Sequence, residues 1–199
     1  MTHEIYCLDV ETTGLDPLKN EVIELSIKRM SNGDQKTWFL RPKRIDCIDP
    51  GALRINHHVL DDLLHKTKEG REKYKDQGET LVEIEEFLNN DGMPSKSRLP
   101  MGQNVAFDMV FLRQLWNSND SGDTFPFGHH VLDTMQIAFV LDYAKDKENM
   151  KDSYSLNALT KAAGIKNEKA HSADADVRAT ADLFDALMAE MTELVKAKK

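Results

Sequence analysis

An apolar run that ends directly in two acidic residues constrains the fold more than any other part of this sequence. The run is Ile5-Tyr6-Cys7-Leu8, and it is followed by Asp9 and Glu11. A short run without polar alternation is typical of a β-strand buried on both faces. Because residues two apart on a strand point to the same face, the carboxylates of Asp9 and Glu11 should project together from the end of a buried strand.

Two carboxylates on one face of a buried strand repel each other, and burial makes the repulsion more costly. A divalent cation bound between Asp9 and Glu11 would offset both costs. The alternative is a strand that ends at Leu8, with both acids in water. The local pattern leaves both interpretations open, because short motifs have many false positives.

The first 40 residues predict three short strands with short connections. The apolar run forms the first strand, and residues 13–17 carry the glycine and proline of a turn. Residues 21–28 alternate in the way of a half-buried strand, and residues 36–40 predict a third strand. Short connections between successive strands predict a meander.

Apolar residues at helical spacing dominate most of the remaining chain. A short strand is expected at 99–102, and helices are expected at 59–64, 80–88, 105–116, 131–143, 155–163 and 172–195. Strands first, followed by helices with a strand between them, predict an α/β layered architecture. The length of 199 residues fits one domain over 1–199.

Composition excludes several classes of protein. The 26 basic and 34 acidic residues give a net charge of −8, which argues against a protein that coats nucleic acid through a basic face. Two cysteines are too few for a disulfide scaffold and favour reduced thiols in the cytoplasm. No signal peptide and no apolar run of about 18 residues is visible, so no membrane association is expected.

Two further aspartates lie where acidic residues need an explanation. Asp108 is the only charge in residues 102–112, and a lone carboxylate in an apolar helix is costly unless it is paired or binds a metal. The alternative is an aspartate at a helix end with one edge open to water. Asp176 follows Ser172, a suitable N-cap for the last helix, and His171 lies just before it. An ordinary first-turn acid that favours the helix dipole also accounts for Asp176.

Three segments in this order resemble the motifs of the DnaQ-like (DEDDh) 3′-to-5′ exonucleases. Leu8-Asp9-Val10-Glu11-Thr12-Thr13-Gly14-Leu15 resembles the first motif, and Gln103-Asn104-Val105-Ala106-Phe107-Asp108 resembles the second. His171, with four residues between it and Asp176, matches the third. The resemblance extends over about residues 4–187 and is specific because all three motifs occur in the correct order. One departure is Gln103, where many members of the family have histidine.

The resemblance implies a ribonuclease H-like, three-layer α/β fold with a mixed five-stranded sheet flanked by helices. It also implies two divalent ions, Mg²⁺ or Mn²⁺, held by four acids at Asp9, Glu11, Asp108 and Asp176. His171 would be the general base on the attacking water, which makes all five residues catalytic candidates. Four residues are candidates for contact with the substrate, namely Thr12, Leu15, Asn104 and Phe107. Plain core packing is the alternative for Leu15 and Phe107.

The function implied is hydrolysis of single-stranded nucleic acid from its 3′ end, with DNA favoured and nucleoside 5′-monophosphates released. Its partners would be DNA or RNA 3′ ends and, in a proofreading role, a DNA polymerase or another replication or repair protein. The alternatives are an RNA-trimming exoribonuclease of the same family, or a non-catalytic nucleic-acid- or polymerase-binding module. A phosphatase of the haloacid dehalogenase type is disfavoured, because it needs aspartate where this chain has Glu11. The pair His57-His58 is interpreted as surface or loop residues.

Overall fold

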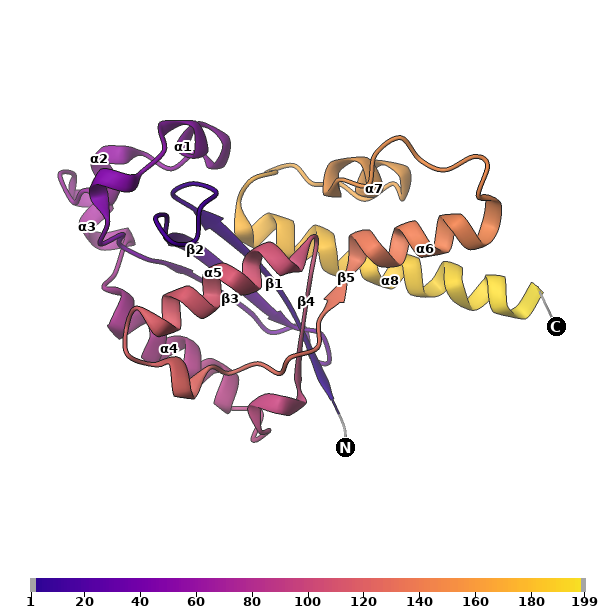
Figure 1. Cartoon of the computed structure of the whole chain (residues 1–199), viewed down its shortest axis with the longest axis horizontal. Helices are drawn as coiled ribbons and strands as arrows, with labels where there is room; N and C mark the ends of the chain where they lie inside the picture. Colours follow the sequence, from indigo (N-terminus) through magenta and orange to yellow (C-terminus); the bar gives the residue numbers. More distant parts are fainter. Residues whose placement is uncertain (1–2, 198–199) are drawn as a thin grey trace.

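A mixed five-stranded sheet forms the centre of the computed structural model, which describes residues 3–197. Its strand order is β3-β2-β1-β4-β5 (Figure 1). The strands are β1 Glu4–Thr12, β2 Val22–Arg29, β3 Gln35–Phe39, β4 Arg98–Gly102 and β5 Leu132–Asp133. β1, β2 and β3 pair antiparallel as a meander, whereas β4 is parallel to β1 and β5 is parallel to β4. The expectations of a meander and of a mixed five-stranded sheet are both confirmed.

Helices cover both faces of this sheet (Figure 1). They are α1 Pro50–Asn56, α2 Leu60–Leu63, α3 Lys68–Lys73, α4 Gln77–Asn89, α5 Val105–Asn117, α6 Thr134–Asp146, α7 Leu156–Ala162 and α8 Ala173–Ala197. Three short 3-10 turns lie at Ile45–Cys47, Ser95–Ser97 and Gly122–Thr124. Two layers of helices around one sheet give the three-layer α/β architecture that the resemblance implied.

Side-chain alternation along β1 assigns its two faces to different helices. Tyr6, Leu8 and Val10 point into the main core, which they share with buried residues of α4 and α5. Cys7 points the other way and packs against Val177 and Ala181 of α8. Because alternate residues share a face, the side chains of Asp9 and Glu11 project toward α8 as well.

The last helix approaches the sheet closely because its contact face is built from small residues. Ala173, Val177 and Ala181 follow one another at intervals of four, which places them on one side of α8, and all three are buried. The far half of α8 packs against α6 and α7, which lie to the side of the N-terminal strands in Figure 1. The first turn of α8 is therefore held directly over the end of β1.

Most of the predicted elements are present, with corrections at their boundaries. The helix expected at 131–143 is wrong at its start, because Leu132–Asp133 joins the sheet as β5 and α6 begins at Thr134. Asp133 begins this helix by accepting a hydrogen bond from the backbone N–H of Met135. The helices α1 and α3 were not expected from the sequence. Within residues 3–197, no helix combines the length and the apolar character that crossing a membrane requires.

Candidate active site

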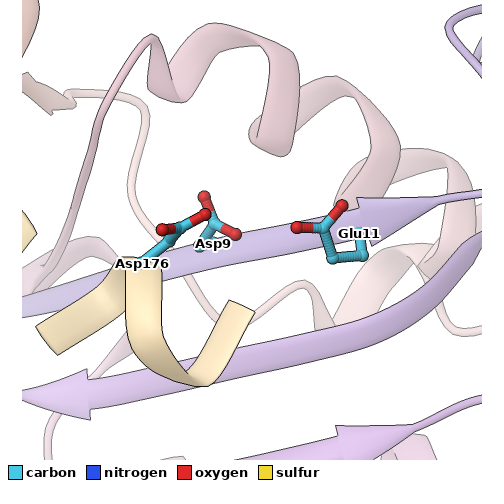
Figure 2. Close-up of side chains that lie close together, drawn as sticks. All are labelled: Asp9, Glu11 and Asp176. Carbon is cyan, nitrogen blue, oxygen red and sulfur yellow. The ribbon is translucent and has the colours of Figure 1, made fainter. Parts of the chain in front are cut away.

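Three carboxylates from two distant parts of the chain meet at the end of β1. Asp9 and Glu11 project from this strand, and Asp176 projects from the first turn of α8 (Figure 2). One carboxylate oxygen of each residue lies within 4.8 Å of an oxygen of the other two. Asp9 and Glu11 therefore lie close together, as strand geometry predicts, and Asp176 is the third residue of the cluster.

The cluster is electrostatically costly for the protein alone. Burial, together with the negative charges of Asp108 and Glu11, raises the pKa of Asp9 well above its usual range. Burial, together with the charges of Asp176 and Glu24, raises the pKa of Glu11 to about 8. Burial also raises the pKa of Asp176. Three carboxylates that resist ionisation beside one another fit a divalent cation, which prefers oxygen ligands and stabilises their charged forms.

Asp176 is oriented by the loop that precedes α8. Its Oδ1 atom accepts a hydrogen bond from the side-chain amide of Asn167 at 2.6 Å, and its Oδ2 atom accepts one from the backbone N–H of His171 at 3.0 Å. The Oδ1 atom of Asn167 is itself buried, and nothing in the described part of the chain donates to it. Asn167 is a site residue that sequence analysis missed, because one asparagine in a charged loop carries no local signal.

His171 lies at the edge of the cluster, next to solvent. Its side chain is exposed, and its backbone adopts a left-handed conformation with φ of 67°. A non-glycine residue in this region costs about 1–3 kcal/mol and persists only where its surroundings hold it there. The hydrogen bond from its N–H to Asp176 supplies such a constraint. The same hydrogen bond keeps His171 next to Asp176, because the donor is the backbone N–H of His171 itself.

Asp108 lies beside the cluster rather than within it. Its side chain extends from the first turn of α5, and its Oδ1 atom accepts a hydrogen bond from the backbone N–H of Val10 at 2.9 Å. Burial and the charge of Asp133 raise the pKa of Asp108 to about 8, despite hydrogen bonds from backbone N–H groups that lower it. Asp108 is 4% exposed, so the alternative of an aspartate open to water does not describe it.

The four candidate substrate residues differ in their burial and in their contacts. Thr12 is buried, and its hydroxyl donates to the carbonyl of Gly14 at 2.6 Å. Leu15 is 81% exposed, so its side chain does not belong to the core. Asn104 has a left-handed backbone and donates its N–H to Asp133, and Phe107 is half-buried against Phe111. Core packing therefore accounts for part of Phe107 but not for Leu15.

Gln103 connects three segments next to the site. Its side-chain amide donates to the carbonyl of Tyr154 at 2.7 Å, and its Oε1 atom accepts from the hydroxyl of Thr134 at 2.6 Å. The residue therefore joins the end of β4 to the start of α6 and to the segment before α7. The Gln103 side chain therefore holds neighbouring segments together by hydrogen bonds. An amide can make these bonds, and it does not titrate.

His57 and His58 are loop residues, as the interpretation of this pair allowed, but His58 is buried. Both residues lie in the connection between α1 and α2, but His58 is only 7% exposed whereas His57 is exposed. The Nε2 atom of His58 lies 3.0 Å from Glu24 Oε2, and its Nδ1 atom lies 2.5 Å from the hydroxyl of Tyr74. No local pattern indicates these partners, because Tyr74 and Glu24 lie 16 and 34 residues from His58 along the chain.

The chain is similar to known proteins in sequence and in fold. A model of the exonuclease family RNase_T matches residues 6–184. The DNA polymerase III PolC-type of Lacticaseibacillus paracasei is 30% identical over 196 residues, which is 96% of this chain and 12% of that protein. The corresponding protein of Staphylococcus aureus is 27% identical over 189 residues, which is 94% of this chain and 11% of that protein. The chain thus spans about an eighth of the length of these relatives.

Solved structures show the same fold at lower identity. The zinc-bound complex of Escherichia coli ExoI with single-stranded DNA superimposes with a TM-score of 0.77 and 23% identity. The alignment covers 99% of this chain and 43% of that one. A product-bound structure of exonuclease I superimposes with a TM-score of 0.74 and 21% identity, over 99% of this chain and 46% of that one.

Proposed function

Because the chain belongs to the RNase_T exonuclease family, which is DnaQ-like, we propose that it removes nucleotides from the 3′ ends of single-stranded DNA. The observation that carries this proposal is the cluster of Asp9, Glu11 and Asp176, whose oxygens lie within 4.8 Å of one another. The complex of ExoI with single-stranded DNA supports the choice of substrate. In this proposal, residues 1–199 form a single exonuclease domain that acts in the cytoplasm.

Four acids would hold the divalent ions in this proposal. Asp9, Glu11 and Asp176 face one another, and Asp108 is adjacent with its Oδ1 atom on the backbone of β1. Two bound Mg²⁺ or Mn²⁺ ions would activate water and neutralise charge on the phosphoryl group and on the leaving 3′ oxygen. Carboxylate oxygens without sulfur ligands favour Mg²⁺ over softer metals.

His171 would accept the proton of the attacking water on a ring nitrogen. Imidazole is the side chain best suited to proton uptake near neutral pH. The exposed ring lies beside Asp176 on a loop that precedes α8. From this position the imidazole would act on a water molecule bound at the carboxylates.

The terminal nucleotide would lie between the β1–β2 loop and the start of α5. The exposed side chain of Leu15 would pack against the last base, and Phe107 would line the pocket. The backbone near Thr12 and the exposed Asn104 would contact the sugar end of the strand. Stacking and backbone contacts of this kind do not read the base sequence.

The PolC-type relatives favour a DNA polymerase as partner.

The direct test uses single strands labelled at the 5′ end. Wild-type protein is incubated with DNA and RNA of equal sequence in Mg²⁺, Mn²⁺ or EDTA. The expected result is a ladder that shortens from the 3′ end with either metal and is absent in EDTA, with DNA degraded faster. Faster degradation of RNA than of DNA would show that RNA is the preferred substrate. The absence of cleavage of either polymer by metal-loaded protein would contradict the proposed activity.

His171→Ala is expected to lower kcat on single-stranded DNA by about 10²–10⁴-fold, which is the usual contribution of a general base. The side chain of His171 is exposed, so folding should be unaffected. The thermal midpoint and the Mn²⁺ affinity should therefore stay close to wild type. The matched control is His57→Ala, an exposed histidine with a similar left-handed backbone. Wild-type activity in both variants would show that His171 is not the general base.

A further inference from the structure

A buried hydrogen-bonded chain lies beneath the first turn of α8. It begins at the hydroxyl of Tyr74, passes through both ring nitrogens of His58, and ends at the carboxylate of Glu24. The side chain of His58 is 2% exposed and that of Glu24 is 5% exposed. None of these three residues takes part in the chemistry described above.

Glu24 is placed where a negative charge is costly. It lies on β2 directly opposite Glu11, and its charge raises the pKa values of Asp9, Glu11 and Asp176. A fourth carboxylate beside three others opposes their ionisation and requires a compensating interaction. One carboxylate oxygen of Glu24 contacts His58, and the other contacts the start of α8.

The contact with α8 is made by the second carboxylate oxygen. Glu24 Oε1 accepts a hydrogen bond from the hydroxyl of Ser172 at 3.3 Å and another from the backbone N–H of Asp174 at 3.4 Å. The first N–H groups of a helix have no partners within the helix, and an acceptor oxygen from a neighbouring element can satisfy them. Glu24 therefore satisfies the start of α8 from a neighbouring strand.

We propose that Glu24 is a positioning residue, held in place by His58, that fixes the first turn of α8 over β1. Both Asp176 in this turn and His171 just before it depend on that placement, because Ser172 follows His171 directly and Asp174 precedes Asp176 by two residues. The role is one of reach and not of charge. The inference rests on the proposed metal site and deepens it. Groups behind the ligands commonly tune metal affinity in this way.

Two substitutions separate reach from charge. Glu24→Asp keeps the charge but withdraws the acceptor from α8 by one methylene, whereas Glu24→Gln keeps the length and an acceptor oxygen but removes the charge. The matched control is Asp91→Asn, because Asp91 is another buried carboxylate, with a side-chain exposure of 4%, paired with Arg98 instead of the site. The primary measurement is Mn²⁺ affinity by titration calorimetry, with thermal midpoints recorded for each protein.

Glu24→Asp is expected to weaken Mn²⁺ binding by about 10–100-fold. Glu24→Gln should stay within about fivefold of wild type, and Asp91→Asn should lower the thermal midpoint without changing Mn²⁺ affinity. A larger loss in Glu24→Gln than in Glu24→Asp would overturn the positional role in favour of a charge effect. Unchanged affinity in both Glu24 variants would also overturn it. Because the readout is metal binding, wild-type protein that binds Mn²⁺ but degrades no DNA would contradict only the proposed function.

Discussion

Asp9→Asn is expected to abolish the proposed nuclease activity and at the same time to stabilise the metal-free protein. The expected loss in kcat on single-stranded DNA exceeds about 10³-fold, because Asp9 contributes a central oxygen to the proposed metal site. The expected gain in stability arises because burial and four neighbouring acids oppose the charge of Asp9. The asparagine has nearly the same shape and carries no charge.

The two effects are measured together, as initial rates in Mg²⁺ and as thermal midpoints in EDTA at pH 8. A gain of about 1 kcal/mol in a chain of this length raises the midpoint by about 2–4 °C. The matched control is Asp182→Asn, which makes the same change at an exposed position on α8 and should alter neither quantity. A variant that loses stability as well as activity would show that Asp9 is held by contacts other than a metal.

The stability of the metal-free protein is expected to fall as the pH rises from about 5 to 8. The pKa of Glu11 is raised from 4.5 to about 8, and that of Asp108 from 3.8 to about 8. Between these values the folded protein binds more protons than the unfolded chain, so the free energy of unfolding decreases with pH. Divalent ions should remove this dependence, because they bind the ionised carboxylates of the folded state.

The measurement is the thermal midpoint at pH 5.5, 6.5, 7.5 and 8.0, in EDTA and in Mg²⁺. The difference between the two conditions should widen with pH and reach at least about 4 °C at pH 8. Glu11→Gln serves as the internal control and should flatten part of the curve in EDTA. A midpoint in EDTA that rises over this range would show that the carboxylates are stabilised by the protein alone.

The parts of the site that could be predicted from the sequence are those encoded over short distances. Asp9 and Glu11 share a face because of strand geometry alone, and the structure places their oxygens together with Asp176. The family resemblance supplied Asp176 and His171, since the helical start at Ser172 explains both residues equally well as ordinary features. Ser172 indeed begins α8 by accepting backbone hydrogen bonds from Ala175 and Asp176.

The parts that could not be predicted depend on partners far along the chain. Glu24 meets His58 across 34 residues and Ser172 across 148 residues. The bond between Asp108 and the backbone of Val10 joins residues 98 apart. Neither local propensity nor hydrophobic periodicity predicts these contacts, because they depend on how distant segments are arranged around the sheet.

Three short elements, α1, α3 and β5, also could not be predicted from the local sequence pattern. The helices α1 and α3 have seven and six residues, and helices of this length gain little from intrinsic propensity. Each is held by side-chain capping at its start, from Asp49 and from Thr67 respectively. The strand β5 has two residues, so the pattern of the following helix concealed it.

The most direct test of the central claim follows the oxygen of the attacking water. Wild-type protein degrades single-stranded DNA with Mg²⁺ in water enriched in ¹⁸O, and the products are identified by mass spectrometry. Hydrolysis at the 3′-terminal linkage with a 3′-oxygen leaving group predicts nucleoside 5′-monophosphates that carry one ¹⁸O on phosphorus, and a shortened strand that carries none. Label on the phosphate of the remaining strand, or release of unphosphorylated nucleosides, would contradict the account.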